Sequence, residues 1–288
     1  MFIDTLKESD VTQPVSVLAE RTRLFLNSLP LERQGGKQLR RLPDGGVVGD
    51  WFGCELSSVF QPIVDPADGS TFGYEAFLRI LGSGERSLSP WTLFSANAED
   101  ERLVALDRVA RTVHALNFIT SVSDDSLLFL NVHGRLLAAV SNDHGGAFRK
   151  VIDALGLPPE RIVIETPLAA SSQPDLLAFV LRNYRSNGFQ VAINVDSPAQ
   201  WQSLSSRVPA QFVKIDGNEL MTASDWVERL RWLSSLRGEA RVIATRLEQK
   251  VAEALPPGLL LQGFAYGQPS QRAALAQPER YATRRPSR

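Results

Sequence analysis

Short runs of apolar residues alternate with longer segments of helical periodicity along most of the chain. The short runs are rich in Val, Ile, Leu and Phe, which is typical of buried strands. In the longer segments apolar residues recur every three or four positions, which predicts helices that pack one face on a sheet. The expected strands are 57–65, 71–80, 127–132, 161–166, 189–195, 211–216, 241–245 and 259–264. The expected helices are 98–119, 146–156, 174–188 and 224–238, with a further short helix between the last two strands.

Alternation of strands and helices predicts a mostly parallel sheet, because parallel neighbours need a long crossover connection. Eight strand candidates with regular crossovers favour a closed barrel over an open doubly wound sheet. The first two candidates are separated by PADGS, a turn sequence with an Asp-Gly step, so they are expected to form a hairpin. The fold class predicted is α/β: a TIM-like (β/α)8 barrel with one antiparallel strand and an N-terminal helical arm.

The first fifty residues differ from the rest of the chain. Residues 15–29 suit one helix with an apolar stripe, and 32–46 (ERQGGKQLRRLPDGG) are polar and glycine-rich, which indicates a linker or loop. The helix could pack on the main domain or serve as a partner-binding arm, and no sequence feature separates the two. The expected division is a helix and linker at 1–50, a barrel domain at 51–280 and a basic tail at 281–288.

Composition excludes several classes of function. The chain has 288 residues and a net charge of −1, so no overall field draws it to nucleic acid or to an anionic membrane. Cys54 is the only cysteine, which rules out an internal disulfide or a thiolate metal cage, and the three histidines lack metal-ligand spacing. No GxGxxG or GxxxxGK[ST] motif occurs. We find no membrane-spanning run and no secretory signal, and therefore expect a cytoplasmic protein.

Polar residues stand at the carboxyl ends of several expected strands. In a parallel barrel the active site lies at that end, so these side chains should converge on one mouth. Taken singly, each has a structural interpretation as a hydrogen-bonded rim residue. Carboxylate and amide oxygens are also the donors that Mg²⁺ or Mn²⁺ prefers, and a lysine can balance carboxylates or meet a phosphate. The set is Glu75, Arg79, Asn131, Glu165, Lys214, Asp216 and Gln262.

Seven short motifs occur in an informative order: FQPIVD, YEAFLR, LDR, LNV, VIET, VKID and QGFAYGQP. In this order they resemble the EAL domain, the cyclic di-GMP phosphodiesterase fold of bacterial signalling. The resemblance covers roughly residues 55–275, and SPWTLF at 89–94 has the family's usual distance from LDR at 106–108. It implies hydrolysis of one phosphodiester bond by two metal ions and a metal-bound water in active members.

The resemblance also assigns roles to four residues at the predicted mouth. Glu75 matches the glutamate of the family signature, and Asn131 matches its metal-binding asparagine. Glu165 matches the first glutamate of the EITE-like strand, and Lys214 matches the catalytic-site lysine.

Other positions depart from the family pattern. Where the family has paired aspartates (DDFGTG) this chain has AINVDSPAQW, and where the family has AEGVE it has ATRLE. Asp196 lies one residue beyond the lost pair, and such a step along a strand turns a side chain to the opposite face. The lost carboxylates correspond to Leu168, Asn194, Val195 and Thr245, while Arg246 replaces a glycine and Glu248 retains the last glutamate.

Four carboxylates lost and one cation gained remove most of the counter-charge that two metal ions need. We therefore predict little or no phosphodiesterase turnover, with Glu75 and Lys214 as catalytic remnants. Glu75, Asn131 and Glu165 could hold one ion, but only weakly. We therefore expect no cofactor, and we expect bound Mg²⁺ or Mn²⁺ only if the protein has residual activity. Without metal, Lys214 is expected to pair with Glu75 or Glu165.

The resemblance further implies contacts to the nucleotide that do not depend on metal. Arg79 offers a planar donor fork for phosphate, and Asp107 matches an acidic residue that accepts hydrogen bonds from a guanine edge. The ligand-binding set is Gln61, Glu75, Phe77, Leu78, Arg79, Asp107, Asn131, Glu165, Lys214, Glu248, Gln262, Gly263 and Pro269.

Three functions stay open on these grounds. The chain could be a cyclic di-GMP receptor and regulator, as some family members with eroded metal sites are. It could have lost the nucleotide and act through an unidentified protein partner, with the N-terminal arm and the DSPAQWQSL loop with its exposed-looking Trp201 as contact surfaces. A tryptophan is, however, more often a packing residue than a binding hot spot. It could instead be an active phosphodiesterase that recruits Asp196 or Asp216. Family members often pair through the barrel, which makes a homodimer a further possibility.

Overall fold

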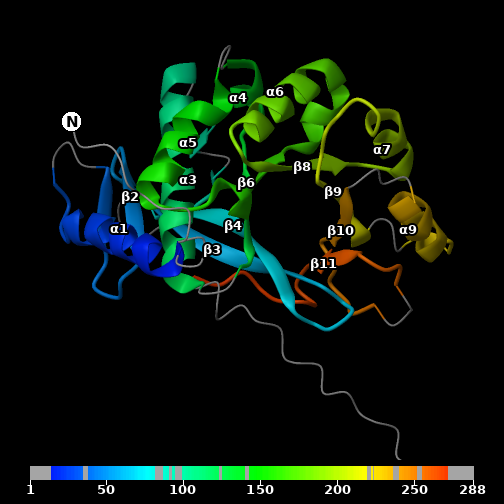
Figure 1. The fold of residues 1–288 in the computed structure, drawn as a ribbon, viewed down its shortest axis with the longest axis horizontal. Coiled ribbons are helices and arrows are strands. Elements are labelled where there is room, and N and C mark those ends of the chain that lie inside the picture. Colours follow the sequence, from blue (N-terminus) through cyan, green and yellow to red (C-terminus); the bar gives the residue numbers. More distant parts are fainter. Residues whose placement is uncertain are drawn as a thin grey trace, which may run out of the picture.

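Eight strands close into a barrel with helices on its outside (Figure 1). They follow one another around the ring in the order β3, β11, β10, β9, β8, β7, β6 and β4, and β4 pairs again with β3. The structure is a computed structural model, and it describes residues 14–34, 38–81, 87–90, 93–94, 99–122, 125–139, 143–218, 222, 224–235, 240–251 and 255–271. The basic tail predicted at 281–288 lies outside these residues.

The barrel strands are β3 (Cys54–Val64), β4 (Thr71–Leu81), β6 (Leu127–Asn131), β7 (Ile162–Thr166), β8 (Gln190–Val195), β9 (Phe212–Asp216), β10 (Arg241–Thr245) and β11 (Leu260–Gln262). The helices are α1 (Pro14–Ser28), α3 (Asp100–Ser121), α4 (Gly134–Ala139), α5 (His144–Leu155), α6 (Pro174–Ser186), α7 (Pro198–Leu204) and α9 (Trp226–Ser235), with short 3₁₀ turns at Pro159–Arg161 and Leu168–Ser172.

Strand β3 runs antiparallel to both of its barrel neighbours, β4 and β11, whereas the other pairs around the ring are parallel. The turn at PADGS joins β3 to β4, with the backbone N–H of Asp65 donating to the Ser70 carbonyl (2.9 Å). Gly69 of its Asp-Gly step adopts a positive φ of 73°, which glycine takes without strain. The predicted fold class, a TIM-like barrel with one antiparallel strand, is confirmed.

The segment 32–46, expected to be a loop, contains the strand β1 (Leu39–Arg41), so that expectation is wrong there. Strand β1 pairs with β2 (Val47–Trp51), and β2 pairs with the part of β3 that extends beyond the barrel. Asn117 of α3 holds this extension, since its side chain both accepts from the Val47 N–H and donates to the Val47 carbonyl (2.8 Å each). On the other side, β5 (Ser87–Leu88) pairs with β4.

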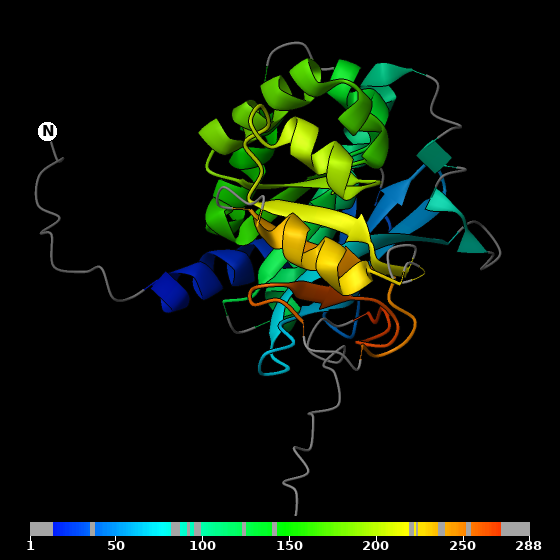
Figure 2. The ribbon, with the colours of Figure 1, turned by 90° about the vertical axis from the view of Figure 1, so that its right-hand side faces the viewer.

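The N-terminal helix predicted at 15–29 exists as α1 and packs on the barrel domain. The Thr22 hydroxyl donates to the carbonyl oxygen of Leu155 at the end of α5 (2.9 Å), and Leu26 is buried in the main core. Figure 2 shows α1, in dark blue, outside the ring of strands. At least the described part of the arm is therefore a docked helix.

One residue that matters to the functional alternatives, Trp201, is placed by packing. Trp201 of α7 is 2% exposed and is buried in the main core. The packing interpretation is therefore correct, and Trp201 is not available as a contact surface. Within the described residues, no helix is both long enough and apolar enough to cross a membrane.

Candidate functional site

An apolar layer fills the barrel and forms the floor of the site. Phe129 and Phe212 pack edge to face at its centre, with ring centroids 5.2 Å apart. Side chains alternate along a strand, so the residue two positions further on points to the same interior. The layer comprises Ile63, Phe129, Val163, Ala192, Phe212, Ile243 and Leu260. Each of these seven residues has a polar residue two positions away along its strand, towards the mouth of the barrel. These polar residues are Gln61, Asn131, Glu165, Asn194, Lys214, Thr245 and Gln262.

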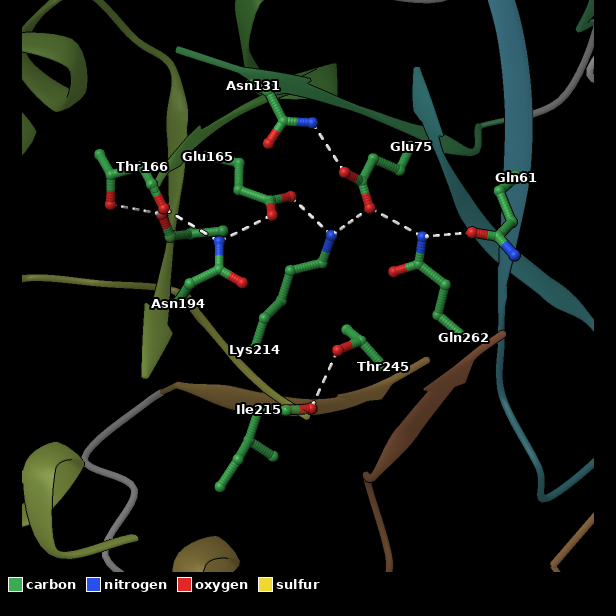
Figure 3. Close-up of polar contacts among 11 residues, drawn as sticks. Gln61, Glu75, Asn131, Glu165, Thr166, Asn194, Lys214, Ile215, Thr245 and Gln262 are labelled. Atoms are coloured by element: carbon green, nitrogen blue, oxygen red, sulfur yellow. Dashed lines mark hydrogen bonds and ion pairs between the residues drawn. The ribbon is translucent and has the colours of Figure 1, made fainter. Parts of the chain in front are cut away.

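Lys214 lies at the centre of this polar layer (Figure 3). Its Nζ is 2.6 Å from Glu75 Oε2 and 2.6 Å from Glu165 Oε2, and the side chain is 1% exposed. The expectation that Lys214 pairs with Glu75 or Glu165 is confirmed, and the pairing involves both. Beneath it, the Phe129 ring faces the ammonium at 5.4 Å.

The Glu75 carboxylate accepts three side-chain donors. Besides Lys214, Asn131 Nδ2 donates to Oε1 and Gln262 Nε2 donates to Oε2, each at 2.7 Å. Gln262 also donates to Gln61 Oε1 (3.3 Å), and Gln61 stands directly opposite Glu75 in the β3–β4 register. Five residues from five different strands thus form one hydrogen-bonded network.

The Glu165 carboxylate has the second half of the network. Asn194 Nδ2 donates to Glu165 Oε1 (2.8 Å) and to the Thr166 carbonyl (2.9 Å). Asn194 is one of the positions where the resemblance expects a carboxylate. Its amide therefore turns an N–H towards Glu165, where a metal ligand would turn an oxygen towards a cation.

One ammonium between two buried carboxylates fixes their protonation in different ways. Burial tends to raise the pKa of Glu75, but Lys214 and three hydrogen bonds outweigh burial and leave this pKa below its ordinary value. Burial and the charge of Glu75 raise the pKa of Glu165, against the opposing effect of Lys214. Burial tends to lower the pKa of Lys214, and the two carboxylates raise it beyond the ordinary value. Glu165 is therefore the group that takes up a proton first.

Two cavities adjoin this network and share Phe77. The first, of about 400 Å³, opens directly above Lys214. It is lined by Gln61, Glu75, Phe77, Glu165, Asn194, Lys214, Thr245, Arg246, Glu248, Gln262, Gly263 and Phe264. Predicted ligand residues thus meet here, as convergence of strand ends requires.

The second cavity, of about 570 Å³, lies between α3 and the end of β4 that projects past the barrel. Leu78, Arg79, Asp107 and Asn131 of the predicted set line it. Pro269 lines neither cavity; it precedes Ser270, whose backbone pairs with Phe60. The structure therefore divides the predicted set between two adjoining spaces.

Asp107 is buried and forms an ion pair with Arg111, one turn further along α3. Burial raises the pKa of the Asp107 carboxyl, although Arg111 opposes this shift. Arg111 also lines the second cavity, and the His133 ring there stacks on Phe94 (4.9 Å between centroids). Neither Arg111 nor His133 was predicted from the sequence as a site residue. The i, i+4 spacing of Asp107 and Arg111 is a signal that predicts their pairing.

The acidic residues proposed as substitute ligands lie elsewhere. Asp196 is exposed, and its carboxylate accepts from the Ser197 hydroxyl (2.8 Å). Asp216 pairs with Arg246 Nη1 (2.9 Å), and Thr245 donates its hydroxyl to the Ile215 carbonyl (3.0 Å). These side chains thus have partners of their own within the described chain.

This donor set does not fit a pair of divalent ions. Two metals need carboxylates that bridge them, whereas both central carboxylates are bound to the Lys214 ammonium. Asn131 and Asn194 direct N–H groups, not oxygens, at those carboxylates. Among the described residues, no group of three His, Cys, Asp or Glu side chains gathers in a way that could hold a metal ion.

Comparison with known proteins identifies relatives of this architecture. The model of the EAL domain family matches residues 52–250. No curated protein sequence matches the chain.

Three solved structures illustrate the likeness. The FimX EAL domain from Pseudomonas aeruginosa bound to c-di-GMP is 22% identical, with a TM-score of 0.61 over 76% of this chain and 92% of that chain. The EAL enzyme Bd1971 in a cAMP- and cyclic-di-GMP-bound form is 18% identical, with a TM-score of 0.61 over 74% of this chain. BlrP1 from Klebsiella pneumoniae, in a manganese/cy-diGMP complex, is 20% identical with a TM-score of 0.60 over 83% of this chain. The alignment covers 62% of Bd1971 and 58% of BlrP1, and at these identities the likeness concerns the fold.

Proposed function

Because the chain belongs to the EAL domain family, we propose that it acts in cyclic di-GMP signalling as a receptor that binds the dinucleotide without cutting it. One observation carries the proposal: the Lys214 ammonium lies between Glu75 and Glu165, at 2.6 Å from each, where carboxylates would otherwise face metal ions. The ammonium balances one of the two carboxylate charges, and side-chain amides donate hydrogen bonds to both carboxylates.

The absence of turnover follows from the chemistry of the reaction. In two-metal hydrolysis the ions generate the nucleophilic water and stabilise the charge on both the attacking and leaving oxygens. A lysine held by two carboxylates supplies neither a metal-bound hydroxide nor an open coordination position. Asn194, which donates to Glu165, supplies no carboxylate at a position where the family pattern has one.

Binding of the nucleotide is supported by the two adjoining cavities and by the relatives. Three solved relatives are described as bound to cyclic di-GMP. Arg79 lines the second cavity with an exposed side chain and donates only a long hydrogen bond to the Leu78 carbonyl (3.3 Å). Its guanidinium can therefore turn to a phosphate at little cost, and such a charge-assisted contact is strong.

Calorimetric titration with cyclic di-GMP tests the proposal, once in EDTA and once in millimolar Mg²⁺. We expect the same affinity in both buffers and no linear dinucleotide in chromatography of the incubated mixture. Arg79→Ala should weaken binding by about 1.5–3 kcal/mol, which is about 10- to 150-fold in Kd. Arg229→Ala, which removes an exposed, ion-paired arginine on α9, is the matched control and should bind as the wild type does.

Each other outcome selects a different function. Turnover to the linear dinucleotide that Glu75→Ala abolishes would make the chain an active phosphodiesterase. No heat and no binding in either buffer would favour a nucleotide-free interaction module. Burial of Trp201 already removes one of the surfaces on which that alternative relied.

A further inference from the structure

Arg246 has a backbone conformation that arginine seldom adopts. Its φ is +59°, and Phe52 is the other non-glycine residue of the described chain with positive φ. For a residue with a Cβ this left-handed region is sterically strained, whereas glycine enters it freely. The arginine therefore stands where a glycine would give a more stable chain.

Neighbouring hydrogen bonds impose this conformation. The N–H of Leu247 donates to the Gln262 carbonyl (3.1 Å), and the Leu247 carbonyl accepts from the Ala265 N–H (3.1 Å). The Leu247 side chain is buried in the core. Strand β10 ends at Thr245, so residue 246 must turn the chain into these fixed contacts in a single step.

The contacts of the Arg246 side chain do little to offset this backbone strain. It is 76% exposed and pairs with Asp216 through Nη1 at 2.9 Å. An exposed ion pair of this kind contributes little to stability, because solvent screens it. Backbone strain that stability does not repay is characteristic of residues kept for a function.

The position of Arg246 indicates which function. It lines the cavity above the network, and Lys214 is the other cation among the described residues that line it. Lys214 is 1% exposed and its charge is balanced by two carboxylates, so it offers no net positive charge to an incoming anion. Arg246 is therefore the accessible cation at this mouth.

We propose that Arg246 binds a phosphate of the dinucleotide and so supplies the accessible positive charge of a mouth that lacks a metal centre; this rests on the proposed receptor function. The guanidinium exchanges Asp216 for the phosphate, which its planar fork can bind through two N–H groups. Asp216 keeps the hydrogen bond from the Asn218 N–H (3.0 Å) after the exchange.

Arg246→Gly separates this role from a structural one, because glycine removes the charge and the strain together. In EDTA we expect its Kd for cyclic di-GMP to rise about tenfold or more, while its thermal unfolding midpoint stays equal or increases. Arg246→Ala, which keeps the strain, should lose affinity equally without the gain in stability. Arg246→Lys should retain part of the affinity, because a point charge remains.

Arg207→Ala is the matched control, since Arg207 is also exposed and ion-paired, to Asp175. Its affinity should equal that of the wild type. If the wild type binds cyclic di-GMP and Arg246→Gly binds it with equal affinity, this inference is overturned and the receptor function stays intact. The same follows from a loss of affinity accompanied by a lower unfolding midpoint. A wild type that does not bind overturns the receptor function and this inference with it.

Discussion

Replacing Lys214 by methionine removes the ammonium that separates two buried carboxylates. Glu75 and Glu165 each have an oxygen 2.6 Å from Nζ, so these oxygens lie within about 5 Å of each other. Two charges at about 5 Å repel by roughly 3 kcal/mol at an effective dielectric constant of about 20. Breaking a buried ion pair by removing one partner costs about 3–5 kcal/mol, which agrees with this value. We expect Lys214→Met to lose about 3–5 kcal/mol of unfolding free energy at pH 8.

The loss should shrink at pH 5, and the sign follows from proton uptake. Without Lys214 one carboxyl group has a pKa above its unfolded value, so the native state binds more protons than the unfolded state. Stability of the variant relative to the wild type therefore rises as pH falls, by about 1.4 kcal/mol for each pKa unit crossed. Urea unfolding of both proteins at the two pH values measures the difference.

Two further variants make the test specific. Lys214→Met combined with Glu165→Gln removes one charge of each sign and should recover most of the loss at pH 8. Lys150→Met removes an exposed lysine of α5 and should change stability by no more than about 0.5 kcal/mol. If the unfolding free energy of Lys214→Met stayed within about 1 kcal/mol of the wild-type value at both pH values, the two carboxylates would not depend on the Lys214 ammonium, and this prediction would be refuted.

Three other predictions concern neighbouring parts of the structure. Asn194→Asp puts a carboxylate where an amide donates to Glu165 (2.8 Å). It should lower the unfolding free energy in EDTA by about 1–3 kcal/mol, and Mn²⁺ should restore part of the loss. An unchanged melting temperature in EDTA would contradict this prediction. Gly263→Ala should cost at least about 2 kcal/mol in urea unfolding, since an added Cβ would clash with the Leu247 carbonyl oxygen and the backbone has a φ of +155°. A smaller cost would mean that the loop around Gly263 moves to make room. Burial lowers the pKa of His114 to about 3, so its NMR signals should not titrate between pH 5 and 8. The stability that the neutral, buried His114 contributes is present above pH 6.5 and is lost as pH falls towards 3. Titration of its NMR signals near pH 6.5 would refute the burial.

Several parts of the site follow from local pattern. Glu165 and Lys214 interrupt runs of Val and Ile that are otherwise continuous, so a buried strand with one polar residue is readable without coordinates. The alternation of strands and helices implies a barrel, and a parallel barrel brings strand ends together. Convergence of Glu75, Asn131 and Gln262 was predictable for this reason.

Other parts depend on neighbours that are remote in sequence. Strand β1 is Leu-Arg-Arg, which reads as a polar loop, and it becomes a strand because β2 offers it a free edge. Trp201 follows a polar stretch and looks exposed, yet α7 turns it into the core. The left-handed backbone of Arg246 results from hydrogen bonds that involve the residues on either side of Gly263.

The sequence by itself determined the order of elements and the residues at the strand ends, because both depend on the period of apolar positions along a local segment. It also determined which carboxylates are missing, since that is a matter of residue identity. Only the tertiary structure decided how the remaining charges are paired, because hydrogen bonds between side chains depend on which strands become neighbours. It thereby committed Lys214 to two buried glutamates and left the guanidinium of Arg246 exposed at the mouth.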